Sequence, residues 1–237
     1  MMRVLDIDLD FFLRDCCPLA EPGERPELKG HEPWPAEEVA RYLEENCLLD
    51  AERPLPGRVF ETHDRALVFW EEKLREGRLT APFHVTHIDA HSDLGIGYPG
   101  PGFVLYNLLS MAPERRYDLR RWYEQKKLDE ANYLLFALGM RRVASLDDVR
   151  EPFSHEDIPP QILTQDGTAI HMESLPSKLF EAKNGPEPTI PFRRIDDGPS
   201  FRAEAPYDFV TLAMSPRYAP READALAEVI RRYIREE

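Results

Sequence analysis

Cysteine is scarce in this chain, and its arrangement excludes two common uses of the residue. There are three cysteines, of which Cys16 and Cys17 are adjacent and Cys47 stands alone. An odd number with one adjacent pair implies no disulfide framework. The paired spacing that holds a structural zinc ion is also absent. This usage is typical of a reducing compartment, and we expect a cytoplasmic protein.

The chain also lacks long apolar runs and has fewer basic than acidic residues. Acidic residues interrupt the first apolar segment, so we expect no signal peptide, and no run approaches the length of a membrane span. There are 30 Lys and Arg residues against 44 Asp and Glu residues, a formal net charge of −14. This balance disfavours nucleic acid and anionic membranes as partners and is compatible with a cationic substrate.

The chain shows no internal repeat or long low-complexity segment, and 237 residues suit one domain over residues 1–237. Strand-like and helical patterns alternate, which predicts an α/β fold with three α/β/α layers and a mainly parallel sheet. The predicted strands are Val4–Phe12, Phe83–Ile88, Ile162–Thr164, Ala169–His171 and Asp208–Met214. The predicted helices are Pro35–Cys47, His63–Glu76 with Thr62 as N-cap, Val104–Met111, Leu119–Lys127, Glu130–Met140 and Leu226–Ile234.

The most informative segment is residues 87–93, His-Ile-Asp-Ala-His-Ser-Asp, at the end of a strand-like run. Asp89, His91 and Asp93 place two carboxylates and an imidazole at alternate positions. This ligand mixture suits divalent ions such as Mn²⁺, Zn²⁺ or Fe²⁺. A solvated loop would need neither the histidine nor the apolar strand before it, so we interpret the segment as a metal-binding motif.

A second acidic cluster, Asp6, Asp8 and Asp10, lies on one face of the first predicted strand. A half-exposed strand with an acidic solvent face is the ordinary explanation of such a row. However, Asp is rare in strands, and three on one face repel one another unless a cation neutralises them. His63, at the start of a predicted helix, could add an imidazole. Together the clusters offer enough ligands for two ions.

Two further histidines lie on the same strand as the motif. His87 lies on the same strand face as Asp89 and could contact the metal ligands without binding the metal itself. His84 has the opposite parity, and we expect it to pack within the strand.

These segments resemble known metallohydrolases. Asp89-Ala90-His91-Ser92-Asp93 is similar to the Asp-Ala-His-x-Asp signature of the arginase (ureohydrolase) family, and Val4–Asp10 resembles that family's second metal-binding strand and the matching strand of histone-deacetylase-like enzymes. The whole chain resembles an arginase-related family that includes peptide arginases. In ordinary arginases the Asp-x-Asp strand follows the Asp-Ala-His motif, so the reversed order here implies a circular permutation, which domains tolerate when their termini lie close together. The supporting segments are Leu5–Phe12, Gly57–Trp70, Val85–Gly95, Asn132–Ala137 and Asp208–Pro220.

The resemblance implies a site with two Mn²⁺ ions. Asp89 and Asp8 would bridge the ions, His63 and Asp93 would complete one, and His91 and Asp10 the other. Asp6 receives no metal in this assignment. A register in which Asp6 and Asp8 are the ligand pair remains the alternative.

The resemblance also implies an activity, the hydrolysis of arginine side chains to ornithine and urea. Two divalent ions about 3.5–4 Å apart lower the pKa of a shared water, which supplies a nucleophile near neutral pH. The late strand has no glutamate to hold the guanidinium group, so Glu61 and Glu130 are the candidates for that role. His155 and His171 could replace the missing proton-shuttling histidine. Loss of amino-acid-binding features implies an arginine-containing peptide as the substrate.

Three other functions remain open. A haloacid-dehalogenase-like phosphatase would use Asp6 as nucleophile and Asp8 as acid and base, but it leaves residues 89–93 unexplained. An amide deacetylase with one zinc ion normally has a histidine at the position of the second strand carboxylate. This chain has Asp10 there, or Phe12 in a shifted register, which argues against a deacetylase. A binding module with a structural metal site would retain metal without turnover.

Overall fold

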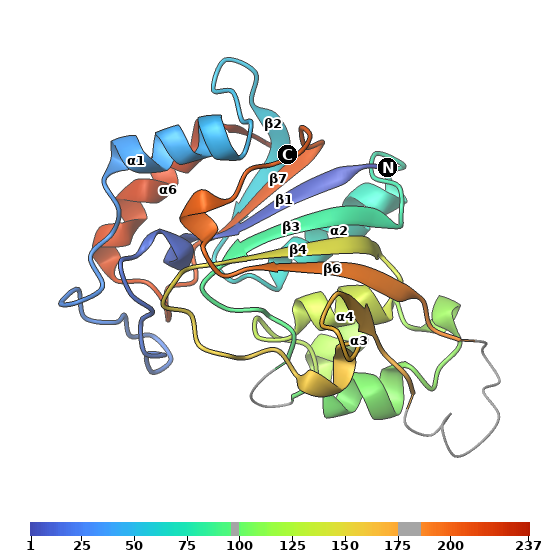
Figure 1. The fold of residues 1–237 in the computed structure, drawn as a ribbon. Helices are drawn as coiled ribbons and strands as arrows, with labels where there is room; N and C mark the ends of the chain where they lie inside the picture. The colour runs from blue at the N-terminus through green and yellow to red at the C-terminus, as the bar shows by residue number, and fades with distance from the viewer. Residues whose placement is uncertain (96–99, 175–185) are drawn as a thin grey trace.

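The computed structural model describes residues 1–95, 100–174 and 186–237, and within them the chain forms an eight-stranded sheet. The order across the sheet is β5-β6-β4-β3-β1-β7-β2-β8, and every pairing is parallel except β5 with β6 (Figure 1). The predicted α/β class with a mainly parallel sheet is therefore confirmed. The strands are β1 (Arg3–Asp8), β2 (Leu55–Phe60), β3 (Phe83–Asp89), β4 (Val143–Arg150), β5 (Ala169–His171), β6 (Thr189–Ile195), β7 (Phe209–Ala213) and β8 (Ile234–Glu236).

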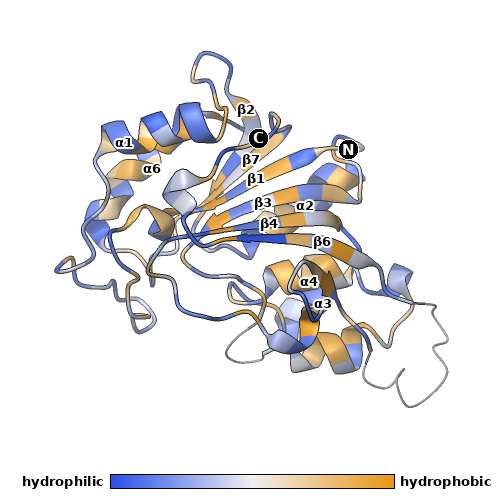
Figure 2. Ribbon diagram, in the orientation of Figure 1, coloured by the Kyte–Doolittle hydropathy of each residue, from blue (hydrophilic) through white to orange (hydrophobic). Residues whose placement is uncertain are grey.

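Helices cover both faces of the sheet, so that it forms the middle of three layers. Along β1, Val4 packs into the core shared with one group of helices, whereas Leu5 and Ile7 pack into the core on the opposite face. This alternation follows from the two-residue period of a strand. Figure 2 shows that α1 and α6 carry both apolar and hydrophilic residues. One face carries α1 (Ala36–Arg41) and α6 (Asp224–Arg231), and the other carries α2 (Arg65–Arg75), α3 (Leu119–Glu124) and α4 (Tyr133–Gly139).

Two predicted elements near the acidic clusters have different bounds. The strand predicted over Val4–Phe12 ends at Asp8, and Leu9–Phe12 form a 3₁₀ turn. Oδ1 of Asp8 accepts the backbone N–H of Asp10 at 3.0 Å, which caps this turn. The helix predicted from His63 begins at Arg65, after Asp64 rather than Thr62, so His63 lies in the preceding turn.

Several strands were missed because charged residues hide their period. β4 contains Asp147, Asp148 and Arg150, all buried, and β6 contains adjacent arginines. Such residues are rare in strands unless they are paired. The strand predicted at Ile162–Thr164 is wrong: Ile162 is the last residue of a 3₁₀ turn, and Leu163 contributes one isolated bridge. At the C-terminus the predicted helix ends early, because Ile234 begins β8.

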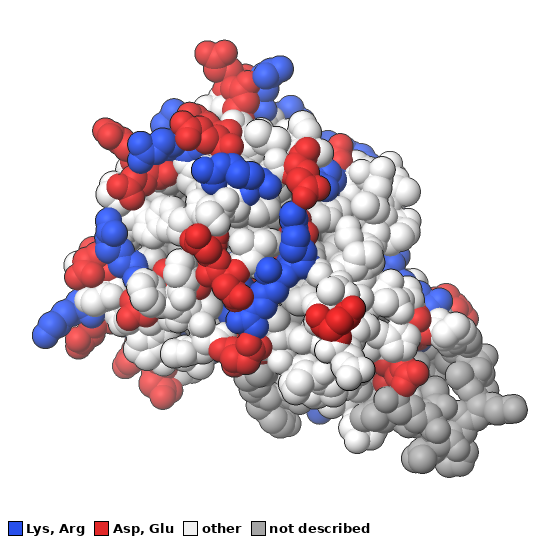
Figure 3. All heavy atoms as spheres, viewed as in Figure 1, with Lys and Arg blue, Asp and Glu red and all other residues white. Residues whose placement is uncertain are grey.

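The described residues include no helix that is both long and apolar enough to cross a membrane. On the face drawn in Figure 3, basic side chains are interspersed with acidic ones.

The strand order brings the two acidic clusters together. β1 and β3 are parallel neighbours, with Asp6 opposite His87 and Ile7 opposite Ile88. Their carboxyl ends, Asp8 and Asp89, therefore lie at the same edge of the sheet. In parallel α/β sheets this edge is where ligands bind.

Candidate metal centre

His63 lies at the centre of a buried cluster of carboxylates. Its Nδ1 is 3.1 Å from an oxygen of Asp8 and 3.0 Å from oxygens of Asp89 and Asp93, while its Nε2 is 3.3 Å from Asp6. Within the described residues, neither ring nitrogen makes a hydrogen bond of acceptable geometry, and Oδ2 of Asp93 has none either. Buried polar atoms are rarely left in this condition. Their convergence fits a divalent cation among them.

Two groups of ligand atoms are close enough to hold a metal ion, within 4.8 Å of one another in each group. Asp89 belongs to both groups, so a carboxylate at this position can contact two neighbouring ions. Carboxylate oxygen and imidazole nitrogen together suit Mn²⁺, Zn²⁺ or Fe²⁺. The first group is His63, His87, Asp89 and Asp93, and the second is Asp10, Asp89 and His91.

Local backbone structure aims these side chains at the cluster. The 3₁₀ turn after β1 brings Asp10 to the end of β3, where its Oδ1 accepts the N–H of Ala90 at 3.2 Å. Oδ2 of Asp10 lies 3.0 Å from Nδ1 of His91. Asp93 has φ of 51°, in the left-handed region that non-glycine residues seldom adopt. Strain of this kind is concentrated at functional sites.

The electrostatics of the cluster also call for a cation. Burial raises the pKa of Asp10 well above its usual value, and the charges of Asp8 and Asp89 raise it further. Burial and the charge of Asp89 raise the pKa of Asp93 to about 7. For His91, burial lowers the pKa, but the carboxylates of Asp10 and Asp89 outweigh it and raise the pKa to about 12. Asp89 differs from Asp10 and Asp93, because burial raises its pKa but contacts with His63, His87 and His91 outweigh burial and lower the pKa well below the usual value.

The contacts of the two other aspartates bear on the register of the acidic strand. Asp6 is fully enclosed, and its carboxylate accepts hydrogen bonds from the hydroxyls of Tyr133 and Thr211. Asp8 accepts from the Ser215 hydroxyl and contacts His63, but it falls outside both ligand groups. Asp10 belongs to one of them. Among the described residues this favours the register that includes Asp10, whereas Asp8, predicted to bridge the ions, belongs to neither group.

His87, which we expected to lie outside the metal ligands, belongs to the first ligand group. Its Nε2 lies 3.3 Å from Asp89, and its ring stacks on that of His63 at 5.1 Å. The signal was present, because His87 and Asp89 share a strand face. His84 lies among hydroxyl groups as expected of a packed histidine, with its nitrogens 2.8 Å from Ser145 and 3.0 Å from Thr86.

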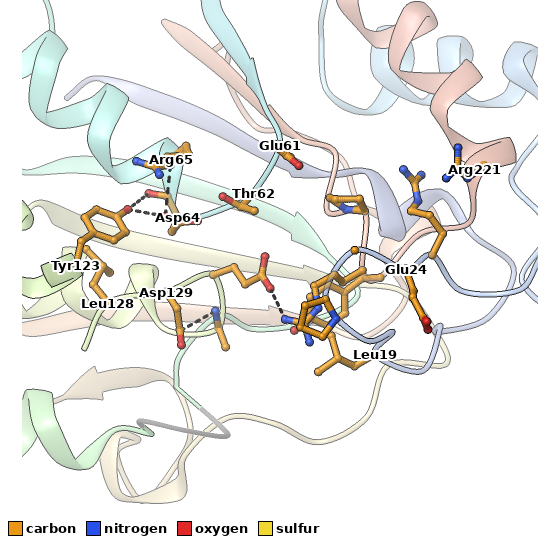
Figure 4. A pocket seen from close by; sticks show the side chains of 18 residues that line it. Leu19, Glu24, Glu61, Thr62, Asp64, Arg65, Tyr123, Leu128, Asp129 and Arg221 are labelled. Atoms are coloured by element: carbon orange, nitrogen blue, oxygen red, sulfur yellow. Dashed lines mark hydrogen bonds and ion pairs between the residues drawn. The ribbon is translucent and has the colours of Figure 1, made fainter. Parts of the chain in front are cut away.

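A pocket of about 780 Å³ adjoins the cluster, and both predicted guanidinium-binding residues, Glu61 and Glu130, line it (Figure 4). Tyr218 lines the same pocket and packs its ring against His91, with centroids 4.9 Å apart. Thr62 and Asp64, which flank His63 in the chain, line it as well. No residue of either ligand group lines the pocket, which neighbours the cluster through Thr62, Asp64 and Tyr218.

The two glutamates differ in their surroundings. Glu61 is exposed, and within the described residues its carboxylate has no hydrogen bond or ion pair. Glu130 is largely buried, 3.6 Å from Nη1 of Arg217. Burial, with the charge of Asp8, raises the pKa of Glu130 to about 7 although Arg217 opposes this. A cation in the pocket would stabilise Glu130 as a carboxylate.

The two proposed shuttle histidines lie elsewhere. His155 is exposed, and its backbone carbonyl accepts a hydrogen bond from the Arg150 guanidinium group. His171 is on β5 at the sheet edge, where its ring contacts Thr189 and Glu173. Neither lines the pocket or belongs to a ligand group.

Comparisons with family models, curated proteins and solved structures found no match for this chain. The buried ligand groups and the pocket beside them are therefore the features that bear on function. Those groups establish a site that could bind metal ions.

Proposed function

We propose that this protein is a binuclear metal-dependent hydrolase that converts arginine side chains of a peptide or protein to ornithine and releases urea. The observation that carries the proposal is the position of Asp89 in two adjacent ligand groups, beside a pocket lined by Glu61 and Glu130. When bound, a pair of divalent ions would supply an activated water and stabilise developing negative charge. Mn²⁺ suits the oxygen-rich ligand set.

The charge of the site favours a cationic substrate. Asp6, Asp8, Asp10, Asp89 and Asp93 are all buried in the cluster. With neutral histidines, two divalent ions leave one of these five negative charges uncompensated. A guanidinium group that enters the pocket would reduce this excess, and an anionic substrate would increase it.

Glu61 and Glu130 would hold the guanidinium group. Carboxylates bind guanidinium through paired, charge-assisted hydrogen bonds that also fix its orientation. His91 is the most open of the ligands, with 34% of its side chain exposed, and it lies where Tyr218 connects the cluster to the pocket. These residues would orient the guanidinium carbon toward the ligand cluster.

The size of the pocket supports a peptide substrate. Its volume of about 780 Å³ is in the upper part of the range for ligand sites and exceeds the needs of one arginine side chain. Arg25 and Arg217 lie in its wall, where they bind backbone carbonyls of the protein itself. The pocket thus has room and polar groups for residues beside the arginine.

The test uses the full chain loaded with Mn²⁺. An arginine-containing peptide, the same peptide with lysine in place of arginine, and free arginine are incubated separately. We expect urea and the mass decrease of an arginine-to-ornithine conversion with the first peptide alone. A metal-loaded protein that produces neither urea nor ornithine from the peptide and from free arginine would refute the proposal.

A second candidate is an amide deacetylase with one ion. The group of His63, His87, Asp89 and Asp93 offers four ligand atoms and could hold a single ion by itself. This candidate predicts one bound ion per chain and release of acetate from an acetyl-lysine peptide. A phosphatase that uses Asp6 as nucleophile is disfavoured, because that carboxylate is enclosed and occupied by hydroxyl donors.

A further inference from the structure

The segment that carries three of the metal-ligand candidates is held by a partly buried ion pair from another part of the chain. Arg150, the last residue of β4, is 1% exposed, and its Nη1 donates to Oδ1 of Asp157 at 2.8 Å. Neither residue belongs to a ligand group or lines the pocket.

The pair binds the backbone between the ligands rather than the ligands themselves. Nη2 of Arg150 donates to the carbonyl of Ala90 at 3.0 Å, and Oδ2 of Asp157 accepts the N–H of Ser92 at 2.8 Å. The hydroxyl of Ser92 also donates to the carbonyl of Asp157 at 3.3 Å. Ala90 and Ser92 are the two residues that alternate with Asp89, His91 and Asp93.

The attachment extends to the ligand on the neighbouring strand. The N–H of Ala90 donates to Asp10, so one residue is bound by Arg150 at its carbonyl and by a ligand carboxylate at its amide. The strained φ of Asp93 follows directly after Ser92. Such a conformation persists only where its surroundings hold it.

We propose that Arg150 and Asp157 are positioning residues that set the spacing of Asp89, His91 and Asp93, and thereby allow the site to hold two ions side by side. Groups that orient metal ligands from outside contribute roughly 10–100-fold to metal affinity in other proteins. This inference rests on the metal centre of the proposed function, but it does not depend on arginine being the substrate.

The decisive variant is Asp157→Ala. Asp157 is partly exposed, with 16% of its side chain accessible, which makes its loss tolerable for the fold. The matched control is Asp147→Ala on β4, where Asp147 pairs with Arg193 at 2.7 Å and faces away from the cluster. Each variant removes one aspartate and its ion pair with an arginine.

The measurements are the Mn²⁺ dissociation constants and the electron paramagnetic resonance spectrum with two equivalents of Mn²⁺. For the parent protein and Asp147→Ala we expect the multiline spectrum of a spin-coupled pair. In Asp157→Ala we expect the weaker dissociation constant to rise by roughly 10–100-fold and the coupled spectrum to disappear. Asp157→Asn, which keeps the shape and one acceptor, should be intermediate, and it replaces the alanine variant if circular dichroism shows that variant to be unfolded.

The proposal would be overturned if Asp157→Ala kept the coupled spectrum and its Mn²⁺ dissociation constants stayed within twofold of the parent's. An equal loss in Asp147→Ala would overturn it as well, and so would the absence of a coupled pair in the parent protein. If the parent holds a coupled pair but releases no urea from arginine peptides, the proposed function fails while this inference stands.

Discussion

His63 and Asp93 face each other with Nδ1 and Oδ2 3.0 Å apart, and within the described chain neither atom makes a satisfactory hydrogen bond. His63 comes from the turn before α2, and Asp93 from the loop after β3. An unsatisfied buried polar group costs about 1–3 kcal/mol. A cation bound by both atoms would remove that cost.

Asp89→Ala should abolish metal retention and turnover together, because among the described residues Asp89 alone belongs to both ligand groups. We expect Mn²⁺ affinity to fall by more than about 100-fold, beyond the effect of groups outside the ligand shell. Metal content after gel filtration and urea release measure the two effects. His84→Ala, on the same strand but opposite face, is the control that should keep both; equal loss in the two variants would contradict the assignment.

Removal of metal should lower thermal stability. Mn²⁺ at 100 times its dissociation constant would stabilise the folded chain by about 2.7 kcal/mol per site. For a chain of this size that is a shift of about 5–10 °C in the midpoint of unfolding. Scanning calorimetry with chelator and then with restored Mn²⁺ measures the shift. A midpoint that is insensitive to Mn²⁺ would argue against any ion at this site.

Glu130→Gln should weaken binding of the guanidinium group, with KM rising about tenfold or more. The pKa of Glu130 is raised to about 7, chiefly by burial. A cation binds its charged form, so KM of the parent protein should fall as pH rises through 7. The glutamine variant should lose this dependence. The matched control is Glu124→Gln, which changes an exposed glutamate paired with Arg120 on α3. If KM of Glu130→Gln still depended on pH as in the parent protein, Glu130 would be excluded from substrate binding.

Glu187→Gln should destabilise the fold by about 1–3 kcal/mol without affecting the metal centre. Arg116 is fully buried and donates to Glu187 at 2.6 and 3.0 Å, and Arg141 donates at 3.0 Å. Burial raises the pKa of Glu187, but Arg116 and Arg141 outweigh it and the pKa is lowered.

A carboxylate whose pKa is lowered by folding stabilises the protein above its unfolded pKa and loses this effect as pH falls through the folded value. The difference between Glu187→Gln and the parent should therefore be full at neutral pH and shrink below about pH 4.5. Urea titrations at pH 7 and 3.5 test this, with the exposed Glu114→Gln as control. A constant difference across that range would show that the carboxylate charge is not responsible.

The alternation of residue types along single strands was visible without coordinates. Asp89, His91 and Asp93 could be recognised because apolar residues lead directly into a period-two row of ligand types. The α/β class followed from the same kind of local pattern. β4 escaped recognition because its buried charges are paired across space, as Asp147 is with Arg193 on β6.

The sequence by itself indicated Asp10, His63, Asp89, His91 and Asp93 as candidate ligands, and it indicated that two acidic segments lie at or near strand ends. Only the tertiary structure decided that β1 and β3 are neighbours, that a 3₁₀ turn carries Asp10 to His91, and that His63, His87 and Asp93 meet. It also brought Arg150 and Asp157 to the backbone of Ala90 and Ser92. The physical reason is that strand order and turn geometry arise from packing of the whole chain, whereas residue periodicity reports only one element at a time.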